Sequence, residues 1–508
     1  MTSAKVLTMK TIKLKEIFAV LFLLLPVFLI SFFFMNSKFI LLDDHEIYRL
    51  YFKEINIFTA ILDDWKNLYR FRPFYWLVRQ VESIFFGINP FFWYSTSLVF
   101  FSTTIISLYL FFKNIGYKSF LAVIFTWASV LGYQSIASWM ALGIQEGLGL
   151  CLFSCSIYQL SLFGLDRIMK NFCLSVIFFF LSFLVKESFF FLIPFVVIII
   201  LWQEKYFTRS FFIKSLAFSS GSIFMIPIIM IQSWRSYKWR MISNNFNQFD
   251  FLKTDNMLNF LALIKENYHL VLTFTFFIIS GVFLVVANRR NSKKIILIFT
   301  FLLCSLGISA QFLIYSFTEY VAPHYIQPIS MIIVLSLSFI LKYYSYKAKF
   351  VYGLLISLVL PITFFNSIRY ANGHNFQSRA LYEIEQQVIQ SNKTDLILVG
   401  HRSRDHEKLF SFYKRISYQS PNKTIYFYHY DNLNKNKNDN RFDVVEDTTM
   451  LNVNSNQLNN YPMIVNISSN GFNDEYNFMT TKLLTKPILK NINYDSTWYV
   501  EAPSLVLK

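Results

Sequence analysis

Charged residues are scarce in this sequence, and cysteine is nearly absent. Lys, Arg, Asp and Glu together make up 15% of the 508 residues, whereas a soluble domain carries about 25%. This scarcity excludes an ordinary soluble globular protein. The four cysteines lie in or beside apolar runs, without metal-ligand spacing to histidine. The sequence therefore gives no basis for a disulfide framework or a cysteine-based metal site.

Long apolar runs take the place of charge through the first 366 residues. Apolar residues make up 55% of the chain, and 60 of them are Phe. Runs of this length predict a polytopic α-helical membrane protein with about 11 transmembrane helices, of which the fifth and sixth are short. The predicted spans are 17–35, 91–112, 119–137, 147–165, 172–185, 188–203, 211–232, 269–287, 295–315, 326–341 and 350–366.

The distribution of basic residues predicts the orientation. If the N-terminus is cytosolic, the inner segments hold 18 basic and only three acidic residues, as the positive-inside rule requires. The net charge of +17 is explained in this way, and no nucleic-acid partner is needed. The first apolar run is too long for a typical signal peptide and lacks a cleavage site, so we expect it to stay as an anchor.

This topology places three large segments outside, at 36–90, 233–268 and 367–508. The last has only strand-length apolar runs, such as "DLILVG" and "TIYFYHY", separated by Asn-rich connections. These features predict a small α/β or mixed extracytosolic domain. No internal repeat is evident in the sequence.

An acidic cluster follows the first predicted span. In "ILLDDHEIYRLYF" (40–52), Asp43, Asp44 and Glu46 place three carboxyl groups beside His45. Carboxylates at a water–membrane boundary repel one another unless they have a partner or a task. A solvated loop start is the simple alternative to a functional site.

Basic residues on the same predicted face could hold an anion. In "YRFRPFYWLVRQ", Arg70 and Arg72 precede an aromatic amphipathic stretch that is typical of an interfacial helix. Two guanidinium groups can bind a phosphate bidentately, and they could equally anchor phospholipid headgroups. In "VKESFFFLIP", Lys186 and Glu187 interrupt an apolar region, where ionisable residues are costly and tend to be functional. An ion pair that caps two short spans is the alternative.

Two outer turns add further candidates. "SFTEYVAPHYIQP" places Glu319, His324 and Tyr325 between apolar runs, although an ordinary tight turn would look the same. "WMALGIQEG" offers Gln145 and Glu146 and is less informative.

In order, side and spacing, these motifs resemble the GT-C superfamily of membrane glycosyltransferases. "LLDDHE" matches the acidic motif after the first span, "RFRPFYW" follows it as in many bacterial members, and "VKES" and "HYIQP" resemble two later outer motifs. The resemblance covers about residues 10–366. It implies a transmembrane catalytic domain at 1–366, which includes the outer loop 36–90, and a periplasmic or extracytosolic domain at 367–508.

The resemblance also implies a reaction. Such enzymes use a polyprenyl-phosphate sugar as donor, here undecaprenyl phosphate, and transfer the sugar with inversion to an acceptor hydroxyl. By this likeness Asp43 would be the general base, Asp44 would orient the acceptor or share a divalent cation, and Glu46 is a third candidate. Arg70, Arg72, Lys186, Glu187, His324 and Tyr325 would surround the donor phosphate and lipid. Some members need Mg²⁺ or Mn²⁺ and others do not, so Asp43 and Asp44 are metal ligands only if a cation is used.

Several readings stay open from the sequence. A polysaccharide polymerase or O-antigen ligase also uses lipid-linked glycans. A lipid-linked glycan transporter or flippase would also be a multi-pass membrane protein. General features resemble the serotype-converting O-antigen glucosyltransferases. They favour a glycan or glycolipid acceptor at the cell surface, such as the O-antigen of lipopolysaccharide, and a protein of the bacterial inner membrane.

Overall fold

The computed structural model describes most of the chain, from Thr2 to Leu507 with gaps. Four sequence features lie outside the described residues: Asp43, Glu319, residues 245–267 of the second outer loop and the Asn-rich stretch after His429. The described residues are 2–40, 44–53, 55–68, 70–204, 206–244, 268–287, 294–316, 323–392, 395–400, 402–429, 463–466, 490–492, 497–499 and 504–507.

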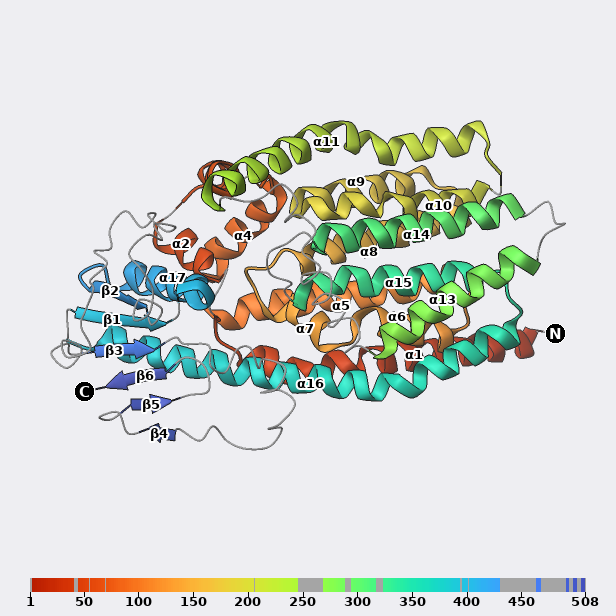
Figure 1. The fold of residues 1–508 in the computed structure, drawn as a ribbon. Helices are drawn as coiled ribbons and strands as arrows, with labels where there is room; N and C mark the ends of the chain where they lie inside the picture. The colour runs from red at the N-terminus through yellow and green to blue at the C-terminus, as the bar shows by residue number, and fades with distance from the viewer. Residues whose placement is uncertain are drawn as a thin grey trace.

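Eight described helices are long and apolar enough to cross a membrane, which makes this a multi-pass membrane protein. They run side by side in one bundle (Figure 1). The helices are α1 (Thr2–Asn36), α5 (Pro90–Asn114), α8 (Glu146–Asp166), α10 (Ile193–Glu204) together with its leading turn η2 (Glu187–Leu192), α11 (Arg209–Asn244), α13 (Tyr268–Ala287), α14 (Lys294–Ser316) and α16 (Tyr346–Gln390).

Three shorter apolar helices fall on the other three predicted spans: α6 (Ser119–Val130), α9 (Met169–Val185) and α15 (Ile326–Leu341). They have 12, 17 and 16 residues, whereas a bilayer core takes about 20. The predicted span 119–137 ends early because Gly132, with φ of +129°, breaks the helix before α7 (Tyr133–Met140) begins. The count of eleven crossings therefore stays a prediction.

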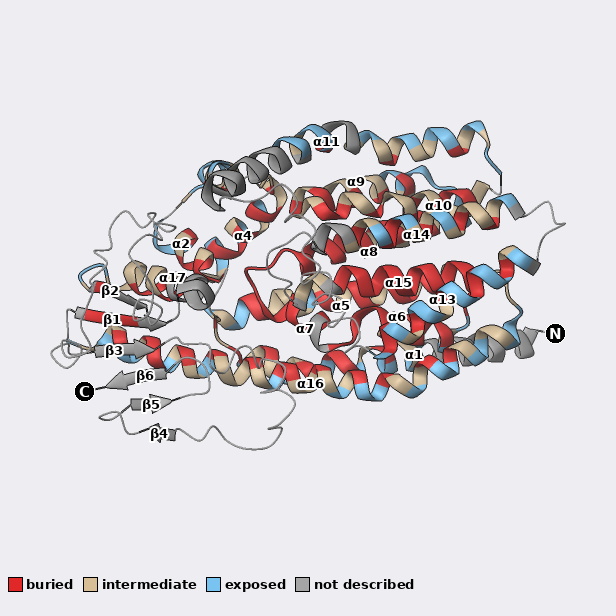
Figure 2. Cartoon of the chain, viewed as in Figure 1, coloured by how far each residue is buried: buried red, intermediate tan, exposed pale blue. Residues whose placement is uncertain are grey.

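Burial within the bundle follows the apolar pattern. α15 is buried along nearly its whole length and lies at the centre, whereas α1, α13 and α14 expose many apolar side chains at the periphery (Figure 2). A helix that is apolar all round suits the core, and exposed apolar faces suit lipid. α8 packs closely on the 138–147 segment, since a Cβ at Gly147 would lie 2.8 Å from the backbone oxygen of Ser138.

The outer loop 36–90 folds into short helices at one end of the bundle. They are α2 (His45–Phe52), α3 (Ile57–Asp63), the π-helical turn η1 (Asp64–Leu68) and α4 (Pro73–Phe86). The Asn56 side chain caps α3 by accepting from Thr59 N, and Pro73 begins α4 at a position that needs no N–H donor. α4 turns Ile84 and Phe85 outward and buries Arg79 and Glu82. A helix at the membrane surface is expected to have this polarity.

The tail begins without a break from the bundle. α16 runs 45 residues and passes through the predicted boundary at 366. Residues Leu381, Ile384 and Val388 of α16 share a small core with α17 (Arg402–Gln419) and with the first strands of a sheet. Because much of 367–508 lies outside the described residues, a separate C-terminal domain stays a prediction.

The described strands of the tail form one six-stranded sheet in the order β2-β1-β3-β6-β5-β4. β1 pairs in parallel with β2 and β3, and the remaining pairs are antiparallel. The strands are β1 (Asp395–Gly400), β2 (Thr424–His429), β3 (Met463–Asn466), β4 (Lys490–Ile492), β5 (Thr497–Tyr499) and β6 (Ser504–Leu507).

The tail and the outer loop lie at the same end of the bundle, at the left in Figure 1 and opposite the N-terminus. α17 rests on α2, where the His45 ring meets the Phe410 ring edge-on at 5.7 Å and the Lys53 ammonium lies 5.2 Å from the Tyr418 ring centre. The described part of the acidic segment (our name for residues 40–52) that forms α2 therefore packs against the tail. That this end is extracytosolic stays a prediction.

Candidate functional site

Asp44 is buried between two backbone segments. The whole residue is only 1% exposed. Oδ2 accepts a hydrogen bond from Ile40 N at 3.0 Å, and Oδ1 accepts one from Gly143 N at 2.8 Å. A carboxylate that binds two backbone amides fixes their relative position. Asp44 thus ties the end of the first span to the 138–147 segment, which we call the linking turn.

Glu46 lies two residues after Asp44 and contacts two basic side chains, His45 and Arg49. Its carboxylate is 2.7 Å from Arg49 Nε and 3.2 Å from His45 Nε2, and Arg49 also reaches Asp63 at 3.3 Å. Burial acts to raise the pKa of Glu46, but the His45 hydrogen bond and the Arg49 charge outweigh it and hold the pKa below its ordinary value. Such a carboxylate is a weak base.

Three sequence-distant motifs meet in a second cluster, which we call the Lys186 cluster: Glu146, Lys186, His324 and Tyr325. Lys186 Nζ forms an ion pair with the fully buried Glu146, and the ammonium lies 4.8 Å from the Tyr325 ring centre. His324 Nε2 is 3.8 Å from Glu146 Oε1. The predicted neighbours Lys186, His324 and Tyr325 are therefore adjacent, around an acid that the sequence analysis ranked low.

His324 is neutral at neutral pH. Its burial lowers the pKa to about 4, even though the Glu146 carboxylate acts in the opposite direction. The Ser138 hydroxyl of the linking turn donates to the His324 carbonyl at 3.1 Å. His324 therefore anchors its own turn and brings no positive charge to the cluster.

The two arginines differ sharply in their surroundings. Arg72 is buried and grips Asp64 bidentately, with Nε to Oδ2 at 2.8 Å and Nη2 to Oδ1 at 2.7 Å, while Trp76 Nε1 donates to the same Oδ2 at 2.9 Å. Arg70 is half-buried, and its charge acts on both Lys186 and His324. Glu187 lies within electrostatic range of Arg72 and Lys186.

The linking turn joins the two clusters. Its Gly143 amide holds Asp44, and the Gly143 carbonyl accepts from Tyr75 Oη at 2.8 Å and from Gln145 Nε2 at 2.9 Å. Three residues further on, Glu146 binds Lys186. The contact points of Asp44 and of Lys186 on the linking turn are thus only three residues apart.

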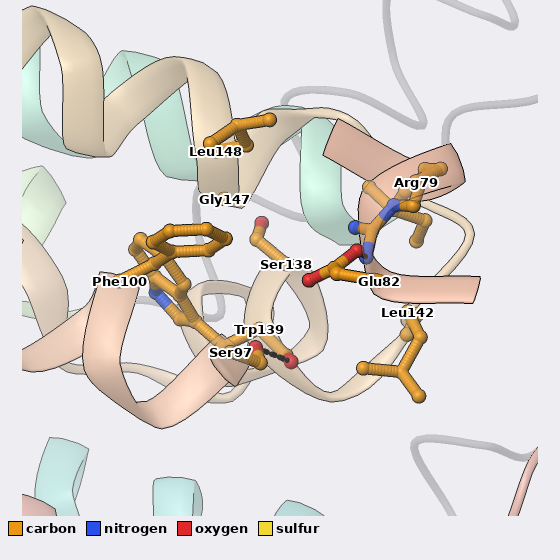
Figure 3. Close-up of a pocket in the computed structure, with 11 residues that line it drawn as sticks. Arg79, Glu82, Ser97, Phe100, Ser138, Trp139, Leu142, Gly147 and Leu148 are labelled. Atoms are coloured by element: carbon orange, nitrogen blue, oxygen red, sulfur yellow. Dashed lines mark hydrogen bonds and ion pairs between the residues drawn. The ribbon is translucent and has the colours of Figure 1, made fainter. Parts of the chain in front are cut away.

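A small cavity lies beside the linking turn (Figure 3). The Arg79–Glu82 ion pair, at 2.7 Å, faces it from α4, and the Ser97 hydroxyl bound to the Trp139 carbonyl closes the other side. Its free space is about that of one water molecule. It is too small for a sugar, and a substrate must bind elsewhere.

The predicted metal ligands can be compared only in part with the structure, because only Asp44 of the pair is described. No group of three His, Cys, Asp or Glu side chains within ligand distance of a common point occurs in the described parts of the chain. Both Asp44 oxygens are taken up by backbone amides. A Mg²⁺ or Mn²⁺ site shared by Asp43 and Asp44 stays a prediction, because Asp43 lies outside the described residues.

Sequence reasoning ranked Glu146 low and missed two other residues that organise this region. Glu146 carried a usable signal, because an ionisable residue at the start of an apolar helix is costly unless it is paired. Asp64, which binds Arg72, and Arg415 of α17 carried none, since their contacts join segments that no local pattern connects.

Comparison with known proteins identifies no family: no family model and no curated protein matches the chain. The solved structures that match the chain include two of ArnT from Cupriavidus metallidurans. The one bound to undecaprenyl phosphate is 11% identical with a TM-score of 0.44, over 96% of this chain and 97% of that one. The apo structure has the same identity and TM-score over 97% and 98%. A likeness at this level assigns no role to a residue of this chain.

Proposed function

We propose that this chain is an inverting membrane glycosyltransferase, which moves a sugar from a polyprenyl-phosphate donor to an acceptor on the extracytosolic side. One observation carries the proposal: the acidic residues Asp44 and Glu46 and the Lys186 cluster are joined by the linking turn at one end of an apolar bundle. A lipid phosphate and a water-borne hydroxyl can meet at such a boundary.

The reaction we propose is a single displacement. The acceptor oxygen attacks the anomeric carbon from the face opposite the phosphate and forms the new C–O bond. The bond between the anomeric carbon and the phosphate oxygen breaks, and its electron pair leaves with the phosphate. The acceptor proton passes to a carboxylate, and the anomeric configuration inverts.

Asp43 is the proposed base, and the neighbouring acids support this choice. Asp44 accepts from two backbone amides and fits a positioning role, while Glu46 is paired with Arg49 and has a lowered pKa. Asp43 directly precedes Asp44 in the sequence. Its carboxylate needs only to reach the acceptor hydroxyl.

Arg70 and Lys186 are the proposed donor-phosphate ligands. Arg70 forms no ion pair within the described part of the chain, and its charge lies within electrostatic range of Lys186 and His324. Tyr325 and Glu187 are the proposed neighbours of the bound phosphate. Arg72 would act indirectly, because its bond to Asp64 fixes the local fold. Neutralising Arg70, Arg72 and Lys186 together should weaken donor binding more than acceptor binding.

For the acceptor we propose a bacterial cell-surface glycan such as the O-antigen of lipopolysaccharide. The protein would then act at the outer face of the inner membrane, with the tail over the glycan. No step above passes through a metal ion. Activity that persists in EDTA would agree with this, and activity that Mg²⁺ or Mn²⁺ restores would give Asp43 and Asp44 a shared ligand role.

Mass spectrometry of cell-surface glycans tests the function, in strains with and without this gene. We expect one hexose per repeat or per chain to be lost with the protein, while glycan length is unchanged. A change in polymer length would support a polymerase. Loss of the whole glycan would support a ligase or flippase, and no change at all would contradict the proposal.

A further inference from the structure

We propose that Arg415, in α17 of the tail, is a positioning residue that holds the acidic segment in place through the backbone of Phe39 and Ile40. The inference rests on the proposed function for its catalytic consequence. Its structural part, that the tail holds this segment, can be tested without any activity.

Arg415 is fully buried and reaches across from the tail to the first span. Nη1 donates to the carbonyls of Phe39 at 3.2 Å and Ile40 at 2.9 Å, and Nη2 donates to Tyr48 Oη at 3.2 Å. Glu385 of α16 binds Nη2 as an ion pair, and Gln419 also donates to Glu385. One guanidinium therefore joins α16, α2 and the end of α1.

An arginine suits this place better than any other residue. Its planar fork offers several donors with fixed directions, and it stays charged when buried. The guanidinium also lies 4.8 Å from the Tyr48 ring centre. Burial acts to lower the pKa of Arg415, but the Glu385 carboxylate outweighs it and keeps the pKa above its ordinary value. A lysine offers a single ammonium and could not span the same acceptors.

The contacts of Ile40 show what Arg415 controls. The Ile40 carbonyl accepts from Arg415, and the Ile40 amide donates to Asp44 Oδ2. Asp44 is itself fixed by Gly143. Ile40 and Asp44 are therefore two anchored points of the chain, four residues apart. Loss of the Arg415 bonds would release one of those points.

Amide hydrogen exchange of the full-length protein tests the clamp, with variants chosen to separate its parts. The key variant is the double substitution Glu385→Gln and Arg415→Met, because removing both charges avoids a buried unpaired one. Glu385→Gln alone keeps the Arg415 bonds to Phe39 and Ile40. Lys423→Met is the matched control, since Lys423 belongs to the tail but donates to Ser391 at 2.9 Å.

In the double variant we expect exchange of residues 39–44 to be ~10-fold faster or more, with the rest of the bundle unchanged. Turnover with undecaprenyl-phosphate-linked glucose and purified lipopolysaccharide should fall ~10-fold, with the donor KM nearly constant, because a misplaced group slows the chemical step. Lys423→Met should behave like the unsubstituted protein in both measurements. Glu385→Gln leaves the Arg415 charge buried without its counter-ion and should lower the Tm.

Unchanged exchange at 39–44 in the folded double variant would overturn the clamp. If that variant does not fold, Arg415→Lys decides: faster exchange at 39–44 supports the proposal, and exchange equal to wild type overturns it. Wild-type protein without transfer to any surface glycan would overturn the proposed function, and the exchange result would still show whether Arg415 holds the segment.

Discussion

Lys186 and Glu146 show how this protein places charge at the edge of an apolar bundle. Glu146 is fully buried, and its ion pair with Lys186 joins the start of α8 to the short break between α9 and η2. Breaking such a pair on one side leaves an uncompensated charge and costs several kcal/mol. The pair therefore has a structural role, whatever ligand Lys186 also binds.

The two members of this pair should differ in their effect on lipid-phosphate binding. Lys186→Met removes the cation and should abolish stabilisation by added undecaprenyl phosphate. Glu146→Gln should lower the Tm as well, but it frees Lys186 and should leave that stabilisation at least as large. Thermal-shift titration with undecaprenyl phosphate measures both. Equal loss in the two variants would remove Lys186 from the phosphate site.

His324 should make the protein sensitive to acid. Its pKa is about 4 in the folded protein and about 6.5 without burial. Between these values the unfolded chain binds more protons, so the stability from neutral His324 is present above pH 6.5 and is lost as the pH falls toward 4. The size is at most on the order of 3 kcal/mol.

His324→Gln isolates this contribution because glutamine does not titrate. We expect the apparent Tm to fall less steeply between pH 7 and pH 4.5 in this variant than in the unsubstituted protein. Parallel curves for the two proteins would show that His324 is not held neutral by burial.

At the scale of elements, the junction of η1 and α4 separates two arginines that sequence alone treats as equals. Arg72 turns inward to Asp64 and Trp76, whereas Arg70 stays half-buried toward Lys186. The buried Arg72–Asp64 pair fixes where α4 begins, and α4 in turn places Tyr75 on the Gly143 carbonyl. Arg72 thus acts on the site through the fold.

Substitutions at this junction should divide between stability and binding. Arg72→Met and Asp64→Asn each leave a buried partner unpaired. Each should lower the free energy of unfolding by about 3–5 kcal/mol and therefore lower the Tm markedly. Arg70→Met should leave the Tm nearly unchanged and raise the donor KM. Thermal melts and donor titrations of the three variants check this. A large stability loss in Arg70→Met would contradict the assignment.

The elements also show how far the sequence predicts the fold. Apolar runs located the bundle helices well, because burial and lipid contact both favour the same residues. The sequence did not predict that α16 continues beyond residue 366. The apolar run ends there, and the rest of the helix is largely polar. The Asp44–Gly143 and Arg415–Ile40 bonds span 99 and 375 residues, and no local pattern encodes them.

At the scale of the whole molecule, the outer loop and the tail share one end of the bundle and touch through α2 and α17. The charge distribution predicts that this end is extracytosolic. A donor phosphate in the membrane and an acceptor under the tail would then meet at the acidic segment.

Protease access tests this orientation. Protease added to right-side-out spheroplasts should cut the tail, 367–508, and leave the bundle intact. Inverted vesicles should protect the tail. Cleavage only in inverted vesicles would place the tail in the cytosol and would contradict the proposed site of transfer.

The most direct test of the account is the rate of sugar transfer by purified Asp43→Asn. We expect folded protein with turnover at least ~100-fold below wild type, because a lost general base typically costs ~10²–10⁴ in rate. Asp44→Asn should instead lower the Tm, since two backbone amides lose their acceptor charge. Turnover of Asp43→Asn within about threefold of wild type would contradict the assignment of Asp43 as the base.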